Sequence, residues 1–138
     1  MPFTHVELDY LKTQRMARLA TIGPAGAPQL RPVVFELNLD LGTIDIGGWD
    51  MGATQKYRNV RREPRVSIVI DDVVCYDPFV DRGIEVRGRA EPIGDHGPMH
   101  PGYSDEIIRV HPRRIVSWGL DPATPGITAR DVACHPPP

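Results

Sequence analysis

The chain has 138 residues, of which 41% are hydrophobic and 25% charged, and its net charge is −2 with a pI near 6.2. This length suits one domain with its own core, and a basic excess of the kind that marks nucleic-acid-binding proteins is absent. No apolar run reaches the ~20 residues of a transmembrane helix, and the N-terminus has neither the positive start nor the apolar stretch of a signal peptide. We therefore expect a cytoplasmic protein that binds neither nucleic acid nor membrane.

The cysteines and histidines show no spacing that carries chemistry. Cys75 and Cys134 are far apart and follow no motif, as expected of a reduced interior. No combination of histidine and cysteine resembles a zinc site, and no serine or cysteine occupies a nucleophile motif such as G-x-S-x-G. The histidines considered are His96, His100, His111 and His135. We therefore expect surface histidines, no metal site, and no hydrolytic or covalent catalysis.

The first part of the chain predicts one helix and three strands. Thr4-His5-Val6-Glu7 has the form of a capping box, which predicts a helix over about residues 5–14. Gly23-Pro24-Ala25-Gly26 is a strong turn signal between the first two strands. Pro32 lacks a ladder donor, so the second strand should be irregular, or at an edge, near this residue. The three strands are expected over about residues 18–22, 29–37 and 43–47.

The second part predicts a short helix over residues 54–63, which Pro64 ends, and three more strands. Gly88 should mark a bulge or tight bend within one of them. The stretch Asp71–Asp81 holds four aspartates but lacks the EF-hand spacing, so it is expected to be a solvent-exposed loop. The strands are expected over about residues 65–70, 84–91 and 114–119.

Six short strands, two helices and many Gly/Pro turns together predict a mainly β fold, an antiparallel barrel with peripheral helices. We expect one domain over residues 1–138, with a flexible tail at residues 130–138 that ends in three prolines.

The segment Thr54–Arg65 is the most informative. It holds five basic residues and one acidic residue in a chain that is net negative, and Lys56 is one of only two lysines, with Lys12. Helix N-termini favour anions through free amides and the macrodipole. Lys56 is therefore placed to meet a phosphate, and Asn59, one turn on, could add a donor. From composition alone, a solvated basic helix face explains the segment somewhat better.

A second segment begins with Gly47 and Gly48 and runs to Gly52. Glycines beside a strand end allow a ligand to approach the backbone closely. The segment matches neither the dinucleotide fingerprint nor the phosphate-loop motif, so an ordinary flexible loop is its better explanation when it is taken alone.

Three segments resemble one known superfamily, that of the pyridoxamine-phosphate-oxidase-like split barrels. Arg18–Gly23 with Gly26–Gln29 resembles its opening hairpin. Lys56–Val66 resembles its cofactor-phosphate helix and the strand that follows, and Gly83–Glu91 resembles the next strand. The sequence is most similar to the actinobacterial deazaflavin-dependent branch, and the match runs from about residue 8 to residue 120.

The resemblance implies a six-stranded antiparallel split β-barrel of the FMN-binding type. Two chains would form a homodimer with two cofactor sites at the interface. The partner chain would contribute the loop Asp72–Phe79 and Trp118. The stretch Ile93–His111 is shorter than in many relatives, so the substrate pocket would be more open.

The resemblance also implies a cofactor site. The strand Arg31–Phe35 would face the tricyclic ring, with Ile46–Gly48 beside it, and Lys56 and Asn59 would hold the phosphate tail. The expected cofactor-binding residues are Arg31, Pro32, Val33, Val34, Ile46, Gly47, Gly48, Lys56, Asn59 and Arg62.

From the resemblance, the leading interpretation is a reductase that moves a hydride from reduced deazaflavin coenzyme F420 to a small organic substrate. F420 is favoured over FMN because the lactate and glutamates of its tail favour a basic surface such as that of Arg58, Arg61 and Arg62. The alternatives are an FMN-binding oxidase or flavin reductase, and a protein that binds the cofactor without turnover. In such enzymes the cofactor carries the difficult chemistry, so no catalytic acid is assigned. Three tyrosines are candidates by residue type alone, Tyr57, Tyr76 and Tyr103.

Overall fold

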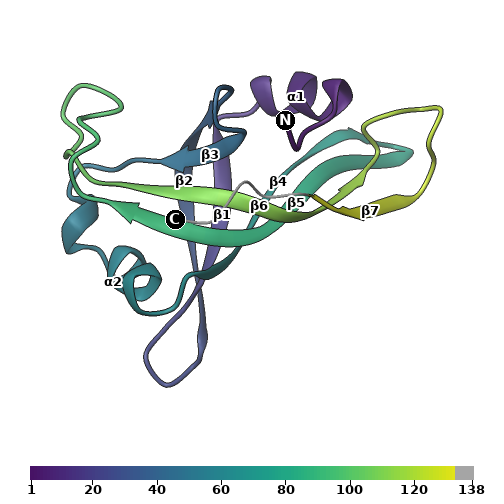
Figure 1. Cartoon of the computed structure of the whole chain (residues 1–138). Helices are drawn as coiled ribbons and strands as arrows, with labels where there is room; N and C mark the ends of the chain where they lie inside the picture. Colours follow the sequence, from purple (N-terminus) through teal and green to yellow (C-terminus); the bar gives the residue numbers. More distant parts are fainter. Residues whose placement is uncertain (133–138) are drawn as a thin grey trace.

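The computed structural model describes residues 1–132, and they form a closed ring of six antiparallel strands that a seventh strand extends (Figure 1). The strand order is β3-β2-β1-β4-β5-β6-β7, and an additional pairing of β3 with β6 closes the ring. The expected mainly β barrel with peripheral helices is therefore confirmed. The strands are β1 (Met16–Ile22), β2 (Pro28–Asn38), β3 (Thr43–Ile46), β4 (Arg65–Tyr76), β5 (Phe79–Ile93), β6 (Ile107–Trp118) and β7 (Ile127–Asp131).

Two helices lie outside the ring, α1 (His5–Lys12) and α2 (Gln55–Arg62), and a single 3₁₀ turn, η1 (Met51–Ala53), precedes α2. The predicted capping box is present, because the Thr4 amide donates to Glu7 at 2.8 Å and the Glu7 amide donates to Thr4 Oγ1 at 3.2 Å. No helix within residues 1–132 is long and apolar enough to cross a membrane.

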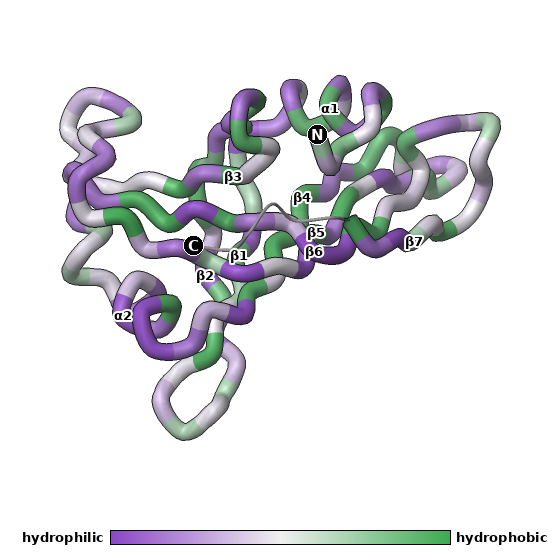
Figure 2. Tube along the Cα trace, in the orientation of Figure 1, coloured by the Kyte–Doolittle hydropathy of each residue, from purple (hydrophilic) through white to green (hydrophobic). Residues whose placement is uncertain are grey.

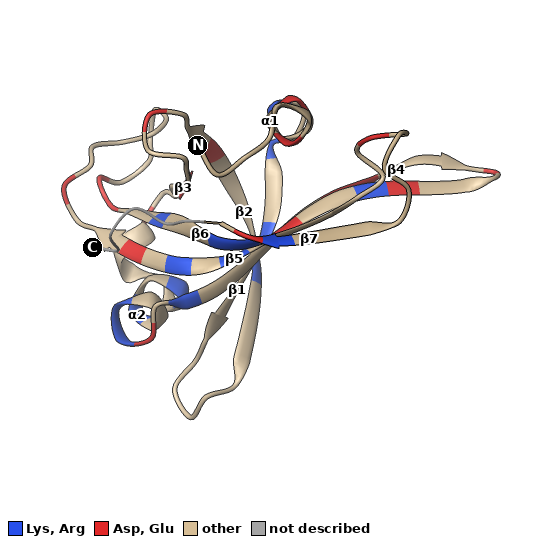
Figure 3. Cartoon of the chain, turned by 45° about the vertical axis from the view of Figure 1, so that its right-hand side comes forward, with Lys and Arg blue, Asp and Glu red and all other residues tan. Residues whose placement is uncertain are grey.

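The core fills the ring. Ile44, Ile46, Ile68, Ile84 and Val110 are fully buried members of it. Tyr57 and Val60, three positions apart, anchor α2 to this core, while most of the helix is hydrophilic (Figure 2). The β1–β2 hairpin projects beyond the ring, and its outer part carries no charged side chain (Figure 3).

The seam that closes the ring is short. Three residue pairs join β3 to β6, and at the middle pair Arg109 donates to both oxygens of the buried Asp45, at 3.0 and 2.9 Å. A carboxylate with 5% exposure needs such a partner, because an uncompensated charge there would be strongly destabilising. The ion pair therefore fixes the register of the closing strand.

Strand β6 is longer than predicted, and β7 was not predicted. The first part of β6, from Ile107, bonds to β3, and its last part bonds to β7. Pro112 lies inside β6 opposite Gly88, where the register shifts, so the predicted bulge at Gly88 is confirmed. A Cβ on Gly88 would lie 2.2 Å from the His111 carbonyl oxygen, which explains the glycine. Pro32 lies where β2 pairs with β1 alone, so the predicted edge position is also confirmed.

The predicted loop Asp71–Asp81 is instead the outer part of a β4–β5 hairpin, paired from Asp71↔Gly83 to Tyr76↔Phe79. The prediction was wrong because these strands are held by backbone pairing and cover no core, so their side chains lack the alternation that marks a half-buried strand. The hairpin extends well beyond the ring (Figure 1).

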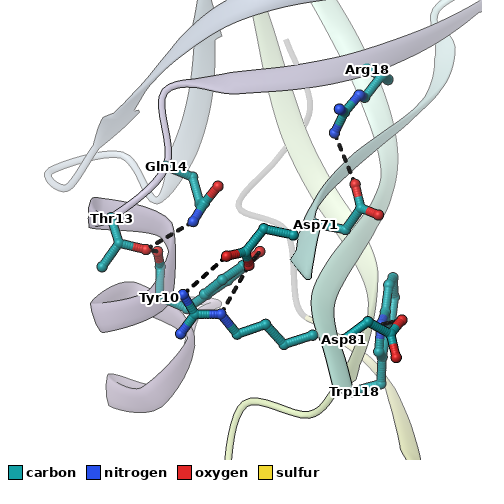
Figure 4. Close-up of polar contacts among 9 residues, drawn as sticks. Tyr10, Thr13, Gln14, Arg18, Asp71, Asp81 and Trp118 are labelled. Carbon is teal, nitrogen blue, oxygen red and sulfur yellow. Dashed lines mark hydrogen bonds and ion pairs between the residues drawn. The ribbon is translucent and has the colours of Figure 1, made fainter. Parts of the chain in front are cut away.

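Three elements hold the base of this hairpin (Figure 4). Tyr10 of α1 donates to Asp72 at 2.9 Å, and Arg82 donates to the same carboxylate at 2.9 and 3.2 Å. Arg18 of β1 pairs with Asp71 at 2.8 Å. The Trp118 indole donates to Asp81 at 3.1 Å. Three of the four aspartates of the stretch therefore serve to orient the hairpin.

Burial, together with the hydrogen bond to Asp72, raises the pKa of Tyr10 well above that of a free tyrosine. The hydrogen bonds from Arg82 and Tyr10 lower the pKa of Asp72. The pair is therefore a hydrogen bond between a neutral phenol and a carboxylate at neutral pH, and it fixes α1 against the hairpin.

The first helix and the last strand are joined by an ion pair. Glu7 is 3% exposed, and Arg130 of β7 donates to it at 2.7 Å and to the Pro2 carbonyl at 2.7 Å. Arg130 and Asp131 thus belong to a strand. Val132 follows and donates its amide to the Arg113 carbonyl at 2.8 Å, whereas residues 133–138 of the tail expected to be flexible, with Cys134 and His135, lie outside the described residues.

Candidate functional site: a cationic cleft beside α2

A cleft of about 650 Å³ opens between the β1–β2 hairpin and the start of α2. It brings together the predicted residues Arg31 and Lys56, from segments that are 25 positions apart in the chain. The residues that line it are Leu19, Thr21, Gln29, Leu30, Arg31, Thr54, Gln55 and Lys56.

The start of α2 forms one wall of the cleft. Thr54 is the N-cap, and its hydroxyl oxygen accepts the amide hydrogen of Tyr57 at 3.3 Å. The first turn contains no acidic residue, so no carboxylate competes for its amides. A helix start of this kind favours an anion.

Lys56 and Arg31 place two positive charges in the same cleft. Lys56 is half-buried, and burial, followed by the nearby Arg31 charge, lowers its pKa. Within residues 1–132, neither side chain forms an ion pair with a carboxylate. Two cations that repel each other in a partly desolvated cleft are stabilised when an anion binds between them.

Asn59 lies beneath the cleft and is fully buried. Its side-chain amide donates to Thr21 Oγ1 and to Gln29 Oε1, both at 2.9 Å, and its carbonyl accepts from Gln55 at 2.7 Å. Both amide hydrogens are therefore used inside the protein. In the structure Asn59 joins α2 to β1 and β2. The sequence instead led us to expect a direct contact between Asn59 and the phosphate.

The arginines of α2 do not line the cleft. Arg58 donates to the Ala53 carbonyl at 2.8 Å and to Gln55 at 3.0 Å. Arg62 donates to the Ile22 carbonyl at 2.9 Å, at the end of the helix opposite Lys56. Together with the exposed Arg61 they give α2 a basic outer face (Figure 3).

The strand segment expected beside the cofactor ring presents two faces. Val33 and Phe35 point into the core, whereas Pro32 is exposed and Val34 half-buried on the opposite side. Side chains alternate along a strand, so only alternate residues can face one flat ring. The sequence prediction of four consecutive contacts therefore requires backbone as well as side-chain contact.

A loop over residues 94–106 covers the glycines that follow β3. A Cβ on Gly47 would lie 2.9 Å from Met99 Sδ and 3.0 Å from Tyr103 Cδ2. Ser104 donates its amide to the Gly48 carbonyl at 2.9 Å, and its hydroxyl accepts from the Met51 amide at 2.9 Å. Sequence reasoning identified Tyr103 by residue type only and missed Met99 and Ser104, because nothing local in the sequence links this loop to Gly47.

The three candidate tyrosines lie in different environments. Tyr57 is buried against the core at 7% exposure, and Tyr76 is 79% exposed near the hairpin tip. Only Tyr103 lies against the predicted ring-side residues, through Gly47. Within residues 1–132, no group of three or more His, Cys, Asp or Glu side chains could hold a metal ion.

The outer β4–β5 hairpin and β7 form an exposed apolar surface, which we call the apolar arm: Val74, Tyr76, Phe79, Val80 and Ile127. A shallow cleft of about 660 Å³, lined by Phe79, Val80 and Ile127, runs along it. Trp118, at its edge, already contacts Gly83, whose Cβ would lie 2.4 Å from the indole ring. Large exposed apolar surfaces of this kind mark interaction sites.

The chain is similar to known proteins over nearly its whole length. The family model for pyridoxamine 5′-phosphate oxidase matches residues 3–130. A 5a,11a-dehydrotetracycline/5a,11a-dehydrooxytetracycline reductase from Streptomyces rimosus is 46% identical over 137 residues, which cover 98% of this chain and 96% of that protein.

Solved structures with the same fold include a conserved hypothetical protein from Mycobacterium tuberculosis, with a TM-score of 0.68, 25% identity and 91% of each chain covered. An F420 reductase has a TM-score of 0.53 and 25% identity, over 73% of this chain and 88% of its own.

Proposed function

This chain belongs to the pyridoxamine 5′-phosphate oxidase family, and we propose that it is an oxidoreductase that transfers a hydride from reduced coenzyme F420 to a small multi-ring organic substrate. The observation that carries the proposal is the cationic cleft, where Lys56 and Arg31 meet at the start of α2 without a carboxylate partner in the described residues.

The residues of the cleft fit the phosphate of a flavin-type cofactor. Lys56 supplies a compact charge with three donors, and Arg31 supplies a planar donor set opposite it. The free amides of the first turn of α2 add neutral donors. Asn59 joins α2 to β1 and β2 and so holds the start of the helix beside Arg31 in one cleft.

When bound, reduced coenzyme F420 would supply the hydride, and the substrate would gain one hydride and one proton across its double bond. The chain itself binds the cofactor and the substrate, orients them and encloses them. Met99 and Tyr103 shield one side of Gly47 from water, and Ser104 fixes the Gly48 carbonyl.

Two observations favour F420 over FMN. The tail of F420 continues beyond the phosphate into carboxylates, and the basic outer face of α2, with Arg58, Arg61 and Arg62, provides charge of the opposite sign. A reductase named for F420 shares the fold at 25% identity.

The relative from Streptomyces rimosus acts, by its name, on dehydrotetracyclines, and it aligns with almost the whole of this chain. This supports a fused-ring compound with a reducible double bond as the substrate class.

We further propose that the protein is a homodimer and that a second copy covers the apolar arm. Val74, Tyr76, Phe79 and Ile127 are between 57% and 79% exposed, which is costly for a lone chain in water. Light scattering at micromolar concentration should give the mass of two chains, and Phe79→Asp should reduce it to one. A monomer mass for the unchanged protein would contradict the proposal.

The function is tested by titrating the protein with oxidised F420 and, separately, with FMN, followed by mixing with reduced F420 and 5a,11a-dehydrooxytetracycline. We expect tighter binding of F420 and substrate-dependent reoxidation of the reduced cofactor. Tighter binding of FMN would assign the protein to the FMN-dependent alternative. Cofactor binding without reoxidation by any fused-ring acceptor would favour a carrier.

A further inference from the structure

Trp49 is the large aromatic side chain closest in sequence to the predicted ring-side residues, and it is 79% exposed. It follows Gly48 directly and lies on the loop that joins Ile46–Gly48 to Thr54 at the edge of the cationic cleft. Within the described residues its indole nitrogen has no hydrogen-bond partner. A tryptophan in this position therefore needs an explanation outside the core.

The backbone on both sides of Trp49 is fixed. The Gly48 carbonyl accepts from the Ser104 amide at 2.9 Å and from its hydroxyl at 3.2 Å, and the Met51 amide donates to the same hydroxyl at 2.9 Å. Met51 itself is fully buried. Hydrogen bonds thus fix the loop immediately before and two residues after Trp49, so the backbone that carries the exposed indole is held in place.

The two neighbouring glycines differ in how open they are. At Gly47 the approach is closed, because Met99 and Tyr103 lie within about 3 Å of where a Cβ would be. At Gly48 the nearest atom to such a Cβ is Met51 Cε at 3.7 Å, which is ordinary contact distance. Of the two glycines, Gly48, next to Trp49, therefore leaves more room for a molecule to approach the backbone.

From this geometry we propose that Trp49 binds the flat fused-ring face of the substrate and acts as its specificity-determining residue. Aromatic side chains supply a large contact area and prefer offset stacking on flat partners. The inference rests on the proposed function for the substrate class, which the similarity to a dehydrotetracycline reductase supports, and on the exposed indole for the residue. In the proposed function Lys56 binds the phosphate end of the cofactor, and Trp49 does not line that cleft.

The test compares Trp49→Ala and Trp49→Phe with the unchanged protein in the reduction of 5a,11a-dehydrooxytetracycline by reduced F420. Loss of stacking in the alanine variant should raise KM about ten-fold with little change in kcat, and phenylalanine should restore part of it. The affinity for F420 and the melting temperature should stay the same. Leu41→Ala, at another exposed apolar residue, is the matched control and should change none of these values.

Three results would overturn the proposal: an unchanged KM in Trp49→Ala, a loss of F420 affinity that places Trp49 against the cofactor, or a loss of dimer mass that places it at the subunit interface. Equilibrium dialysis with oxytetracycline, without cofactor, is run in parallel on the same proteins. If the unchanged protein shows no turnover, the proposed function fails, and the dialysis still decides the role of Trp49. Weaker binding by the alanine variant supports it, whereas equal or absent binding refutes it.

Discussion

Replacing Lys56 by alanine separates an anion-binding role from a merely solubilising one. The ammonium group is half-buried and faces Arg31, with no carboxylate in the described residues to neutralise either charge. In the complex, its loss removes one charge-assisted hydrogen bond to the phosphate, about 1.5–3 kcal/mol, so F420 affinity should fall about ten- to a hundredfold. Without cofactor, the change removes a repulsion and a desolvation cost. The free energy of unfolding should then be unchanged, within about 0.5 kcal/mol, or slightly higher.

Fluorescence titration with F420 measures the affinity of each protein, and urea denaturation measures its free energy of unfolding. Lys12→Ala is the matched control, since Lys12 is the other lysine and lies exposed at the end of α1. It removes the same net charge far from the cleft and should leave affinity unchanged. Lys56→Arg should keep most of the affinity. The reasoning is refuted if Lys56→Ala binds F420 within twofold of the unchanged protein, or if Lys12→Ala loses as much.

Three further results are expected. Burial lowers the pKa of Lys56 in the free protein, and a bound phosphate would raise it. At pH values between the free and the bound pKa, cofactor binding therefore takes up a proton. F420 affinity should therefore be constant at low pH and fall as the pH rises through the lowered pKa, a dependence that titrations at several pH values should find missing in Lys56→Ala. Asn59→Ala removes three hydrogen bonds and should cost about 2–4 kcal/mol in a urea melt; a stable variant that has lost cofactor affinity would make Asn59 a direct ligand instead. Tyr10→Phe removes one hydrogen bond to a carboxylate and should cost about 1–2 kcal/mol by the same measurement, and an unchanged midpoint would contradict the role of α1 in holding the hairpin.

The parts of the fold that could be predicted are those whose cause is local in the sequence. The capping box at Thr4 and the ending of α2 before Pro64 each depend on residues within a few positions of one another. The bulge was indicated by one residue, Gly88, although the His111 carbonyl that requires a glycine there lies on the next strand. The outer hairpin and β7 could not be predicted in this way. Their strands are held by backbone pairing to a neighbour and cover no core, so hydrophobic alternation is missing.

The same distinction between local and long-range causes applies to the candidate site. Lys56 was predicted from its residue type and its position at a helix start, and the structure places it in a cleft. The burial of Asn59 could not be predicted, because its partners Thr21 and Gln29 are 38 and 30 residues away. The closure of Gly47 by Met99 and Tyr103 likewise depends on a loop about fifty residues further along the chain.

The ion pair between Glu7 and Arg130 joins residues from opposite ends of the described chain, which bears on the order of folding during protein synthesis. Glu7 leaves the ribosome 123 residues before its partner, which at ordinary elongation rates is about 6–25 s earlier. Until Arg130 emerges, docking α1 would bury a carboxylate without its counter-charge, which would cost about 3–5 kcal/mol. We therefore expect the helix that is made first to dock last, when β7 has joined the edge of β6.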